Sequence, residues 1–380
     1  MKILVFTEYF PTSERDLAGG VEKRAFHLLG ALAKKHDVSV ICSFQGKSQK
    51  RFDRIEGIDV MRVGMVHPYS NEGSIVSRLV YAVSAFVAGI VIARPDVVDG
   101  YSYLNYPIAS VVGRIRNASV VLTYHESWST QEWVRLKGWV TGMFGAVWTG
   151  IARSLPFDRI VAVSNETRSR LIKQGISAKK VSVVYNGIDV AQMHAIKARV
   201  RPHSVMTSAR LIKSKRVDVL VRAVDELRKE FPDIFLTIHG DGEERKPLEK
   251  LISQLKLQKQ VIITGRINSF DRVLKLRKQH QVFCLPSEVE GFGMVVVEAM
   301  ASGIPVVCSD IPVLHEITGD KGALFFRVGD HKALAQQLRV LFIDQKMCAQ
   351  KQKEGVIFAQ KYDWKRIAAD AEKVYREVVR

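Results

Sequence analysis

The strongest constraint on the fold of this chain is an alternation of short apolar runs with helix-length amphipathic stretches. Such alternation predicts βαβ units, and strands almost continuous in Val, Ile and Leu are typical of parallel sheets covered by helices on both faces. In the first half, strands are predicted at 2–6, 38–43, 58–62, 96–99, 119–124, 159–163 and 181–184, and helices at 21–35, 75–93, 131–153 and 165–174.

The alternation restarts near residue 203, after the turn sequence Asn186-Gly187-Ile188-Asp189 and a polar, basic stretch over 192–202. A chain of 380 residues is long enough for two domains. In this second series, strands are predicted at 203–207, 234–239, 260–264, 281–285, 305–307 and 323–325, and helices at 217–230, 246–256, 293–302 and 330–343.

We therefore predict an α/β protein with two Rossmann-like domains, residues 1–200 and 201–362. Residues 363–380 are predicted to form an amphipathic helix that packs back toward the first domain, because Trp364 and Tyr375 fall near one face. Open parallel sheets bind ligands beyond the carboxyl ends of their strands. The two sheets are therefore expected to face each other across a cleft that holds the active site.

The net charge of +18 is compatible with a nucleic acid, an anionic membrane surface or an anionic small substrate as partner. Lys and Arg are spread over both halves, without an RNA-binding aromatic signature or Cys/His finger spacing, so we expect no nucleic-acid partner. The four cysteines are isolated, which favours a reduced, cytoplasmic setting. The strand-like Lys2–Phe6 predicts no signal peptide.

Residues 75–93 are strongly apolar and raise the question of a membrane segment. Arg78 interrupts the run, and the uninterrupted part is shorter than the ~20 residues of a spanning helix. The run leads into Arg94-Pro95-Asp96-Val97-Val98, which is typical of the start of a strand. We therefore favour a helix buried against a sheet.

The stretch Pro286–Met294, which follows a predicted strand, contains the most candidate ligand-binding groups. Gly291 and Gly293 allow the backbone to approach a ligand closely, and the start of the next helix offers unpaired N–H groups to a phosphate. Glu290 could accept hydrogen bonds from sugar hydroxyls, and Glu298 lies about two helical turns further on. The alternative is a glycine-rich turn with solvated glutamates.

A basic stretch, Ser208–Arg216, follows the first predicted strand of the second domain. Arg210 and Lys215 are well placed to hold a diphosphate. Such cations stabilise the charge that develops on a departing nucleoside diphosphate without a metal ion. The alternative is a solvated basic loop.

Two candidates lie in the first domain. Gly19-Gly20 opens a predicted helix, either to bring backbone close to a ligand or simply as a flexible start. His125 follows the predicted strand 119–124, where it either faces the ligand cleft or is a hydrogen-bonded structural histidine.

Several cofactor motifs are missing from the sequence. Gly240-Asp241-Gly242 follows a predicted strand but lacks the third glycine of a dinucleotide fingerprint. There is no Walker A sequence, no G-x-S-x-G motif and no Asp-x-Asp pair. A dinucleotide-binding motif and a metal-held diphosphate clamp of the Asp-x-Asp kind are therefore not indicated.

The run from Glu290 to Glu298 resembles the E-x7-E motif of the retaining GT-B glycosyltransferases of family GT4. The resemblance covers nearly the whole chain, and the order and spacing of its parts make it specific. Its other parts are Gly19-Gly20, Pro95-Asp96-Val97-Val98, His125, Val163-Ser164, Asn186-Gly187-Ile188-Asp189, Arg210 with Lys215, Gly240-Asp241-Gly242 and the closing helix from Trp364.

The resemblance implies that the second domain holds a nucleotide-diphosphate sugar. Glu298 would bind the ribose hydroxyls, and Glu290 the donor sugar near its 3-hydroxyl. Arg210 and Lys215 would neutralise the leaving diphosphate. Backbone groups would contact the base at Arg266 and Ile267, and the sugar or phosphate at Phe292, Gly293 and Met294.

From the first domain, the resemblance implies that Gly19 and Gly20 approach the diphosphate and that His125 contacts the sugar near its reacting carbon. It implies a retaining front-face displacement, in which the departing phosphate takes the acceptor's proton and neither a metal ion nor an organic cofactor is needed. A double displacement with Glu290 as nucleophile is the alternative. One departure is Arg216, where the family usually has glycine.

The acceptor is expected on the first domain, as a glycan or a lipid-linked hydroxyl compound. The segment from Trp128 to Pro156 is rich in aromatic and basic residues, which favours peripheral attachment to an anionic inner membrane, whereas the alternative is a helix packed within the fold. These residues are Trp128, Trp133, Trp139, Phe144 and Trp148, with Arg135, Lys137 and Arg153. A sugar-nucleotide epimerase and a non-catalytic basic adaptor are the competing functions.

Overall fold

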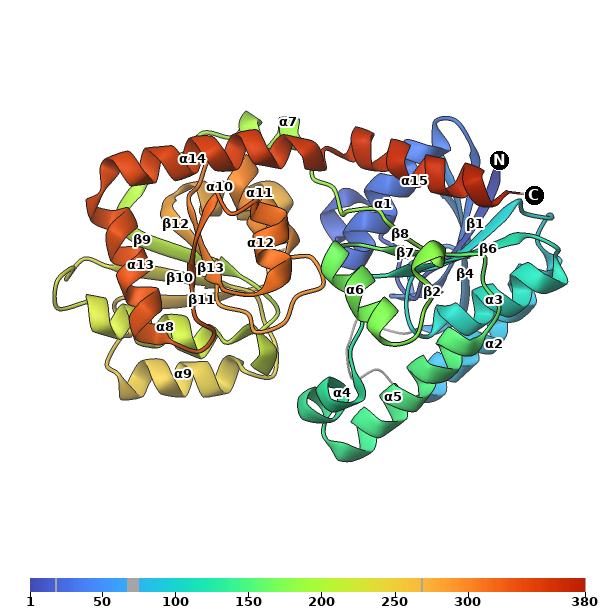
Figure 1. Ribbon diagram of the computed structural model, residues 1–380, viewed down its shortest axis with the longest axis horizontal. Helices are drawn as coiled ribbons and strands as arrows, with labels where there is room; N and C mark the ends of the chain where they lie inside the picture. Colours follow the sequence, from blue (N-terminus) through green and yellow to red (C-terminus); the bar gives the residue numbers. More distant parts are fainter. Residues whose placement is uncertain (18, 67–74, 268, 380) are drawn as a thin grey trace. The chain divides into compact units, whose positions relative to one another are not determined.

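The computed structural model describes residues 1–17, 19–66, 75–267 and 269–379 (Figure 1). The chain divides into two compact units. The first unit contains Met1–Gly187 and Trp364–Arg380, and the second contains Ile188–Asp363. The division follows Gly187, whereas the sequence analysis placed the boundary after residue 200.

The first unit is built on an eight-stranded sheet with the order β3-β4-β2-β1-β5-β6-β7-β8. Neighbouring strands are parallel except β3 and β4, which are antiparallel. All seven predicted strands are present. The strands are β1 Lys2–Phe6, β2 Asp37–Phe44, β3 Phe52–Ile55, β4 Ile58–Val66, β5 Val97–Gly100, β6 Ser119–Tyr124, β7 Arg159–Ala162 and β8 Val181–Val183.

Strand β3 is the one that the sequence analysis missed. It is a short edge strand whose two central residues, Asp53 and Arg54, are charged, so it lacks the apolar run expected of a strand buried on both faces. A two-residue turn joins it to β4, with positive φ at both Glu56 (50°) and Gly57 (81°).

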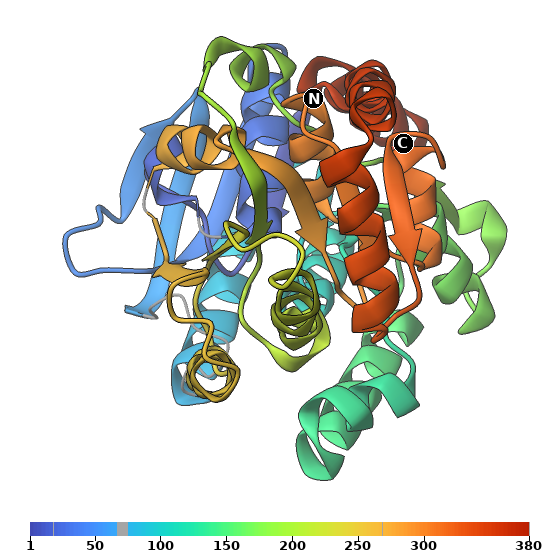
Figure 2. The same cartoon turned by 90° about the vertical axis from the view of Figure 1, so that its left-hand side faces the viewer.

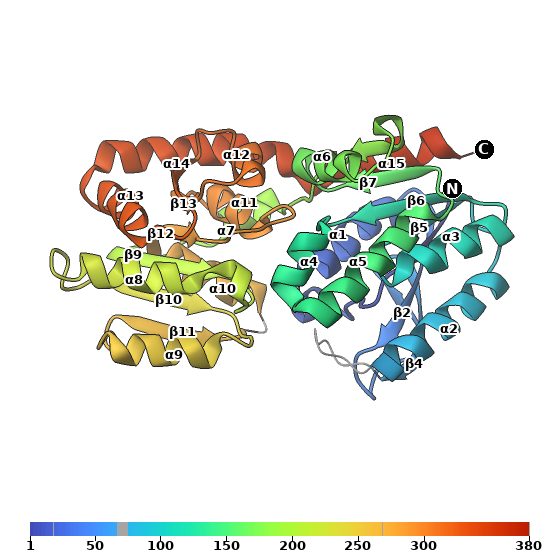
Figure 3. The same cartoon turned by 60° about the horizontal axis from the view of Figure 1, so that its bottom comes forward.

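Helices cover both faces of this sheet (Figures 1 and 3). Leu4 and Val98 point into an apolar cluster shared with α2, α3 and α5. The next residue along β5, Asp99, points to the other face and accepts a hydrogen bond from the Tyr375 hydroxyl of α15 (2.7 Å). The helices are α1 Gly20–Ala33, α2 Ile75–Val91, α3 Asn105–Ile115, α4 Thr130–Lys137, α5 Trp139–Ser154, α6 Asn165–Lys173 and α15 Trp364–Val378.

The helix predicted over 131–153 is two helices. Gly138 separates α4 from α5 with φ 78° and ψ 168°, a conformation that side-chain-bearing residues rarely adopt. The resulting hairpin projects from the rest of the first unit, as Figure 2 shows in teal and green. The break was missed because the apolar residues continue through it.

The prediction for residues 75–93 is confirmed, because α2 packs Tyr81 and Ala85 into the core beneath it. Within the part of the chain that the structure describes, no helix is both long enough and apolar enough to cross a bilayer.

The second unit has a six-stranded, fully parallel sheet with the order β11-β10-β9-β12-β13-β14. Its strands are β9 Arg201–Ser208, β10 Phe235–His239, β11 Val261–Gly265, β12 His280–Leu285, β13 Val306–Ser309 and β14 Ala323–Phe326. Its helices are α7 Val190–Ala195, α8 Val217–Leu227, α9 Arg245–Gln254, α10 Phe270–Lys278, α11 Met294–Ala301, α12 Pro312–Thr318, α13 His331–Ile343 and α14 Gln345–Ala359.

All six predicted strands and four predicted helices of this unit are present, but the sequence analysis gave no helices for α7, α10, α12 and α14. Helix α7 has only six residues. Helix α10 has charged residues at five of its nine positions, and α12 has only seven residues, so neither shows a clear apolar period. Helix α14 buries only Gly355 and Ala359 fully, which explains its weak signal.

The chain passes between the units twice, at neighbouring points. A Cβ on Gly187 would lie 2.4 Å from the indole of Trp364, so glycine is needed for this packing. In the second unit, Ile188 forms a parallel bridge with Asp363, and its N–H donates to the Tyr362 carbonyl (2.8 Å). The turn sequence at 186–189 therefore packs against the start of the closing helix.

Candidate active site

Lys215 and Glu290, predicted on separate loops, form an ion pair in the second unit. Lys215 ends a short 3₁₀ helix after β9, and Glu290 lies in the loop after β12. The Lys215 Nζ and Glu290 Oε1 atoms are 2.6 Å apart, and both side chains are largely buried. The Glu288 N–H also donates to the Ser214 carbonyl (2.9 Å), so the two loops are joined through their backbones.

The glycine-rich loop ends at Gly293, where the backbone requires glycine. Its φ is 91°, and a Cβ there would lie 3.1 Å from side-chain atoms of both Leu314 and Ile317. Helix α11 begins at the next residue, and no side chain caps its first turn at Gly293. The amide groups at this end of α11 are therefore suited to a phosphate or a sugar oxygen.

Glu298 lies inside α11 and is buried, with 3% of its surface exposed. Its Oε2 accepts a hydrogen bond from Nη2 of Arg277 in α10 (2.8 Å), and this arginine is also buried. Among the described residues, the Nε and Nη1 atoms of Arg277 have no hydrogen-bond partner. The sequence analysis missed Arg277 because it lies in a charge-rich helix that has no family motif.

His239, at the end of β10, is a second group that the sequence analysis missed. Its Nδ1 lies 2.6 Å from the Ser208 hydroxyl, and the N–H of Ile267 donates to its Nε2 (3.4 Å). Nε2 is therefore an acceptor, which places the proton of the neutral ring on Nδ1. Burial, and then the positive charge of Arg277, lower the pKa of His239 to about 4, so the ring is neutral at physiological pH.

The loops after β9 and β10 are fixed against each other. The Leu211 N–H donates to the Asp241 carbonyl (2.9 Å). A Cβ on Gly240 would lie only 1.9 Å from the Ala209 carbonyl oxygen. This packing explains the Gly240-Asp241-Gly242 sequence and fixes the backbone at Arg210, whose side chain is exposed. Arg266, after β11, is likewise exposed.

Arg216 has the backbone conformation that its place in the motif requires. Its φ is 47° and its ψ is 39°, in the left-handed region where glycine is favoured. The guanidinium donates to Asp218 through Nε (3.2 Å), and its Nη1 lies 3.9 Å from Glu288. These contacts hold the side chain of a residue whose backbone is strained.

In the first unit, Gly19 and Gly20 mark the start of α1. The φ of Gly19 is −148°, an extended conformation open to any residue, and no side chain caps the helix there. Arg24, in the second turn, is buried and was missed by the sequence analysis. Its Nη1 donates to the Tyr185 carbonyl (2.7 Å) and to Oδ1 of Asn186 (3.0 Å), which ties α1 to the end of β8.

His125 directly follows β6 and is half-buried beside Tyr101, with 5.9 Å between ring centroids. Burial, and then the charge of Arg24, lower the pKa of His125 to about 3, so the ring is neutral at physiological pH. Its buried Nε2 has no hydrogen-bond partner among the described residues. A neutral ring with an unused polar atom suits a ligand contact better than a purely structural role.

The aromatic segment divides into an inner and an outer part. Trp133 packs on Trp128 and Tyr103, with ring centroids 4.7 and 5.5 Å apart, and the Trp148 Nε1–H donates to the Tyr103 carbonyl (2.9 Å). Trp139 and Phe144, in contrast, are 73% and 70% exposed. Packing within the fold therefore explains part of this segment and leaves α5 with exposed rings.

Solved structures share this fold over nearly the full chain. The structure matches sucrose-phosphate synthase from Thermosynechococcus elongatus with a TM-score of 0.86 and 18% identity, over 99% of this chain and 98% of that one. It matches Anabaena HepE, solved with UDP and glucose, with a TM-score of 0.77 and 18% identity, over 99% and 100%. The fold is therefore the α/β GT-B fold of glycosyltransferases.

Sequence comparison gives the family. Residues 18–192 match the model Glycosyltransferase Family 4, and residues 191–357 match Glycosyl transferases group 1. The chain belongs to the GT4-type glycosyltransferases and is a transferase enzyme. A glycogen synthase of Mycobacterium tuberculosis is 29% identical over 297 residues, which cover 74% of this chain and 69% of that protein.

Proposed function

We propose that this enzyme transfers a hexosyl unit from a nucleotide-diphosphate sugar to a hydroxyl group of a glycan or lipid-linked acceptor, in the cytoplasm. The observation that carries the proposal is the largely buried Lys215–Glu290 pair beside the start of α11, which no side chain caps. It combines a cation for a diphosphate, a carboxylate for sugar hydroxyls and the amide end of a helix within two joined loops. The solved HepE complexes with UDP and with UDP-glucose support this donor class.

The donor would bind to the second unit through these groups. Lys215 and Arg210 neutralise the diphosphate, while Glu290 orients Lys215 and binds the sugar. Glu298 binds the ribose, held in position by its 2.8 Å hydrogen bond from Arg277. The backbone at Arg266 and Ile267 binds the base. The backbone of the loop from Gly291 to Met294, which includes Phe292 and Gly293, is proposed to contact the sugar or the phosphate.

We further propose that the reaction retains the anomeric configuration and needs no metal. The acceptor oxygen forms a bond to the anomeric carbon on the face from which the diphosphate leaves, and the leaving phosphate oxygen takes the acceptor's proton. Lys215 and Arg210 supply the positive charge that a metal would otherwise provide. In the first unit, neutral His125 is proposed to hydrogen-bond the sugar, and Gly19 and Gly20 to approach the diphosphate.

Nucleotide release from UDP-, GDP- and ADP-sugars tests this function. We expect release from one donor with the wild type and its loss in Glu298→Ala, whereas Glu249→Ala, an exposed carboxylate in α9, leaves it unchanged. No release from any donor, with no thermal stabilisation by any nucleoside diphosphate, would contradict the proposal. A glycosyl adduct on Glu290 in peptide mass spectra would favour the double displacement instead.

A further inference from the structure

Three helices of the first unit, α2, α3 and α5, carry apolar side chains on their outer faces. Their inner faces pack on the sheet through residues such as Tyr81, Val112 and Ala152. Thirteen large apolar side chains of these helices are nevertheless exposed, a set that packing within the unit does not explain. The apolar helical face consists of Val76, Leu79, Val83, Val87, Val91, Val111, Ile115, Trp139, Val140, Met143, Phe144, Val147 and Ile151.

The spacing of these residues shows that each forms part of a stripe. On α2 the exposed positions recur every three or four residues from Val76 to Val91, and on α5 they run from Trp139 to Ile151 with helical spacing. All three helices lie on the same side of the sheet (Figures 1 and 3). The first unit therefore presents several apolar stripes on one of its sides.

Within the three helical segments, the charged residues are all cations. The segments 75–95, 105–117 and 133–157, which contain the three helices, include no Asp or Glu, although Asp96, Glu132 and Asp158 directly flank them. A protein surface of this size normally mixes both signs. The cations of these segments are Arg78, which is paired with Glu8 (3.1 Å), and Arg94, Arg114, Arg116, Arg135, Lys137 and Arg153.

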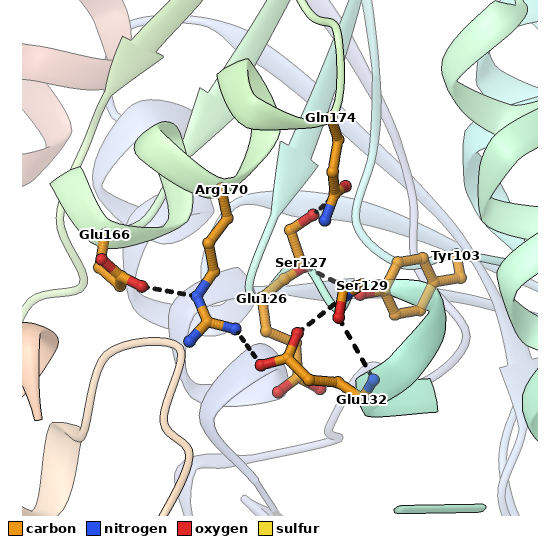
Figure 4. Close-up of polar contacts among 8 residues, drawn as sticks. All are labelled: Tyr103, Glu126, Ser127, Ser129, Glu132, Glu166, Arg170 and Gln174. Atoms are coloured by element: carbon orange, nitrogen blue, oxygen red, sulfur yellow. Dashed lines mark hydrogen bonds and ion pairs between the residues drawn. The ribbon is translucent and has the colours of Figure 1, made fainter. Parts of the chain in front are cut away.

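A polar network holds the α4–α5 hairpin in place (Figure 4). Arg170 of α6 donates to Glu166 and to Glu132 of α4 (2.7 Å each), and Glu132 forms a capping box with Ser129. Gln174 accepts hydrogen bonds from Ser127 (2.8 Å) and from Arg153 of α5 (2.5 Å). Trp139 and Phe144 are thus carried on a hairpin that is anchored to the sheet.

We propose that the apolar helical face docks on an anionic lipid surface. Aliphatic side chains and the rings of Trp139 and Phe144 enter the headgroup region, while the surrounding cations contact the phosphates. The absence of carboxylates from the three segments matches an anionic bilayer, which offers negative charge along its whole plane. The inference goes beyond the donor chemistry proposed above and does not depend on which nucleotide sugar is used.

Vesicle flotation tests this docking, with phosphatidylcholine vesicles that contain or lack phosphatidylglycerol. We expect binding only to the anionic vesicles, weakened by salt because the cations contribute. The pairs Trp139→Ser with Phe144→Ser and Val83→Ser with Val87→Ser are each expected to reduce binding roughly tenfold or more. The pair Arg114→Glu with Lys137→Glu is expected to reduce it and to weaken its salt dependence.

The matched control is Ile343→Ser with Ile357→Ser, which removes two exposed apolar side chains of the second unit (52% and 64% exposed) and should leave binding unchanged. Unchanged thermal unfolding and nucleotide release of all variants would show that the fold and the transferase site are intact. Failure of the wild type to float with anionic vesicles at low salt would overturn the proposal. So would a dimer in light scattering that the α2 and α5 pairs dissociate, which would assign the face to a second copy.

Discussion

Both units are built on a largely parallel sheet, but their crossover helices differ in what they expose. In the second unit, α8 buries Leu220 and Val224 and turns Arg222 and Glu226 to solvent, as expected of a helix with one apolar stripe. In the first unit, α2 buries Tyr81 yet exposes Val83 by 65%. Because both helices cover a parallel sheet, the sheet does not account for the outer face of α2. That face is the one proposed above to dock on an anionic lipid surface.

The units also differ in their buried charges. The second unit has ion pairs beside its strand ends, where the donor is proposed to bind: the buried Arg277–Glu298 pair and the partly buried Lys215–Glu290 pair. The first unit buries Arg24, which contacts backbone carbonyls and Asn186. This arrangement agrees with the proposals above, in which the second unit binds a nucleotide-diphosphate sugar and the first unit docks on a lipid surface.

The largest expected effect concerns the buried pair of the second unit. Arg277→Met removes the buried cation that contacts the Glu298 carboxylate, which should cost about 3–5 kcal/mol of unfolding free energy. Arg245→Met, which breaks exposed ion pairs to Asp241 and Glu249, should cost less than about 1 kcal/mol. Urea denaturation of both variants measures the difference. Equal losses of unfolding free energy would show that the buried ion pair stabilises the unit no more than the exposed ones do.

A leucine on each crossover helix gives a direct test of the comparison. Leu220→Ala in α8 removes a fully buried side chain and should cost about 2–5 kcal/mol. Leu79→Ser in α2 changes a side chain that is 60% exposed, so its effect should stay within about 0.5 kcal/mol. A large loss for Leu79→Ser in denaturant unfolding would mean that the outer face of α2 stabilises the fold itself.

Lys215→Ala tests the catalytic role of the second unit. Loss of the cation that faces the leaving diphosphate should lower the rate of nucleotide release by about 10²–10³-fold. Lys213→Ala, an exposed lysine two residues earlier, is the matched control and should change the rate little. A Lys215→Ala enzyme with an unchanged kcat would remove Lys215 from the proposed mechanism.

Arg216→Gly should stabilise the second unit slightly. Glycine relieves the left-handed backbone at φ 47°, a gain of about 1 kcal/mol, and the partly exposed ion pair to Asp218 contributes less than that. The expected result is a small rise in Tm by calorimetry. A fall in Tm would show that the contacts of Arg216 outweigh the backbone strain.

The pH dependence of stability also distinguishes the two units, which should respond in different pH ranges. Burial raises the pKa of Asp99, in the first unit, from 3.8 to about 7, so stability falls as the pH rises between these values. In the second unit, burial would lower the pKa of His315, but hydrogen bonds to Asp320 and Asp310 raise it overall. Its contribution is complete below about 6.5 and is lost as the pH rises through the folded value.

Unfolding free energies of Asp99→Asn and His315→Gln across this range separate the two contributions. Asp99→Asn should remove part of the pH dependence below about 7, and His315→Gln the part above about 6.5. Unfolding curves that keep the wild-type pH dependence in both variants would exclude these two groups as its source.

The sequence predicted the sheets and the loop positions of the candidate site well, for a physical reason. Buried parallel strands must be continuously apolar, and ligand groups follow their carboxyl ends, so Lys215 and Glu290 could be placed without a structure. Arg277 and Arg24 could not be predicted, since each is buried by contacts with residues distant in sequence. Gly138 was missed because a single glycine does not interrupt an apolar period, although its φ ends α4.

The way the chain returns to the first unit has a mechanical consequence. Strand β1 and helix α15 both belong to that unit, and Ser119 and Asp99 hold α15 through its Val378 carbonyl and its Tyr375 hydroxyl. A force that pulls the two ends of the chain apart therefore acts first on β1, α15 and the contacts between α15 and the sheet. The second unit, inserted between Gly187 and Trp364, bears no load until α15 has detached. In a force-extension experiment the second unit should therefore unfold after the first unit has opened.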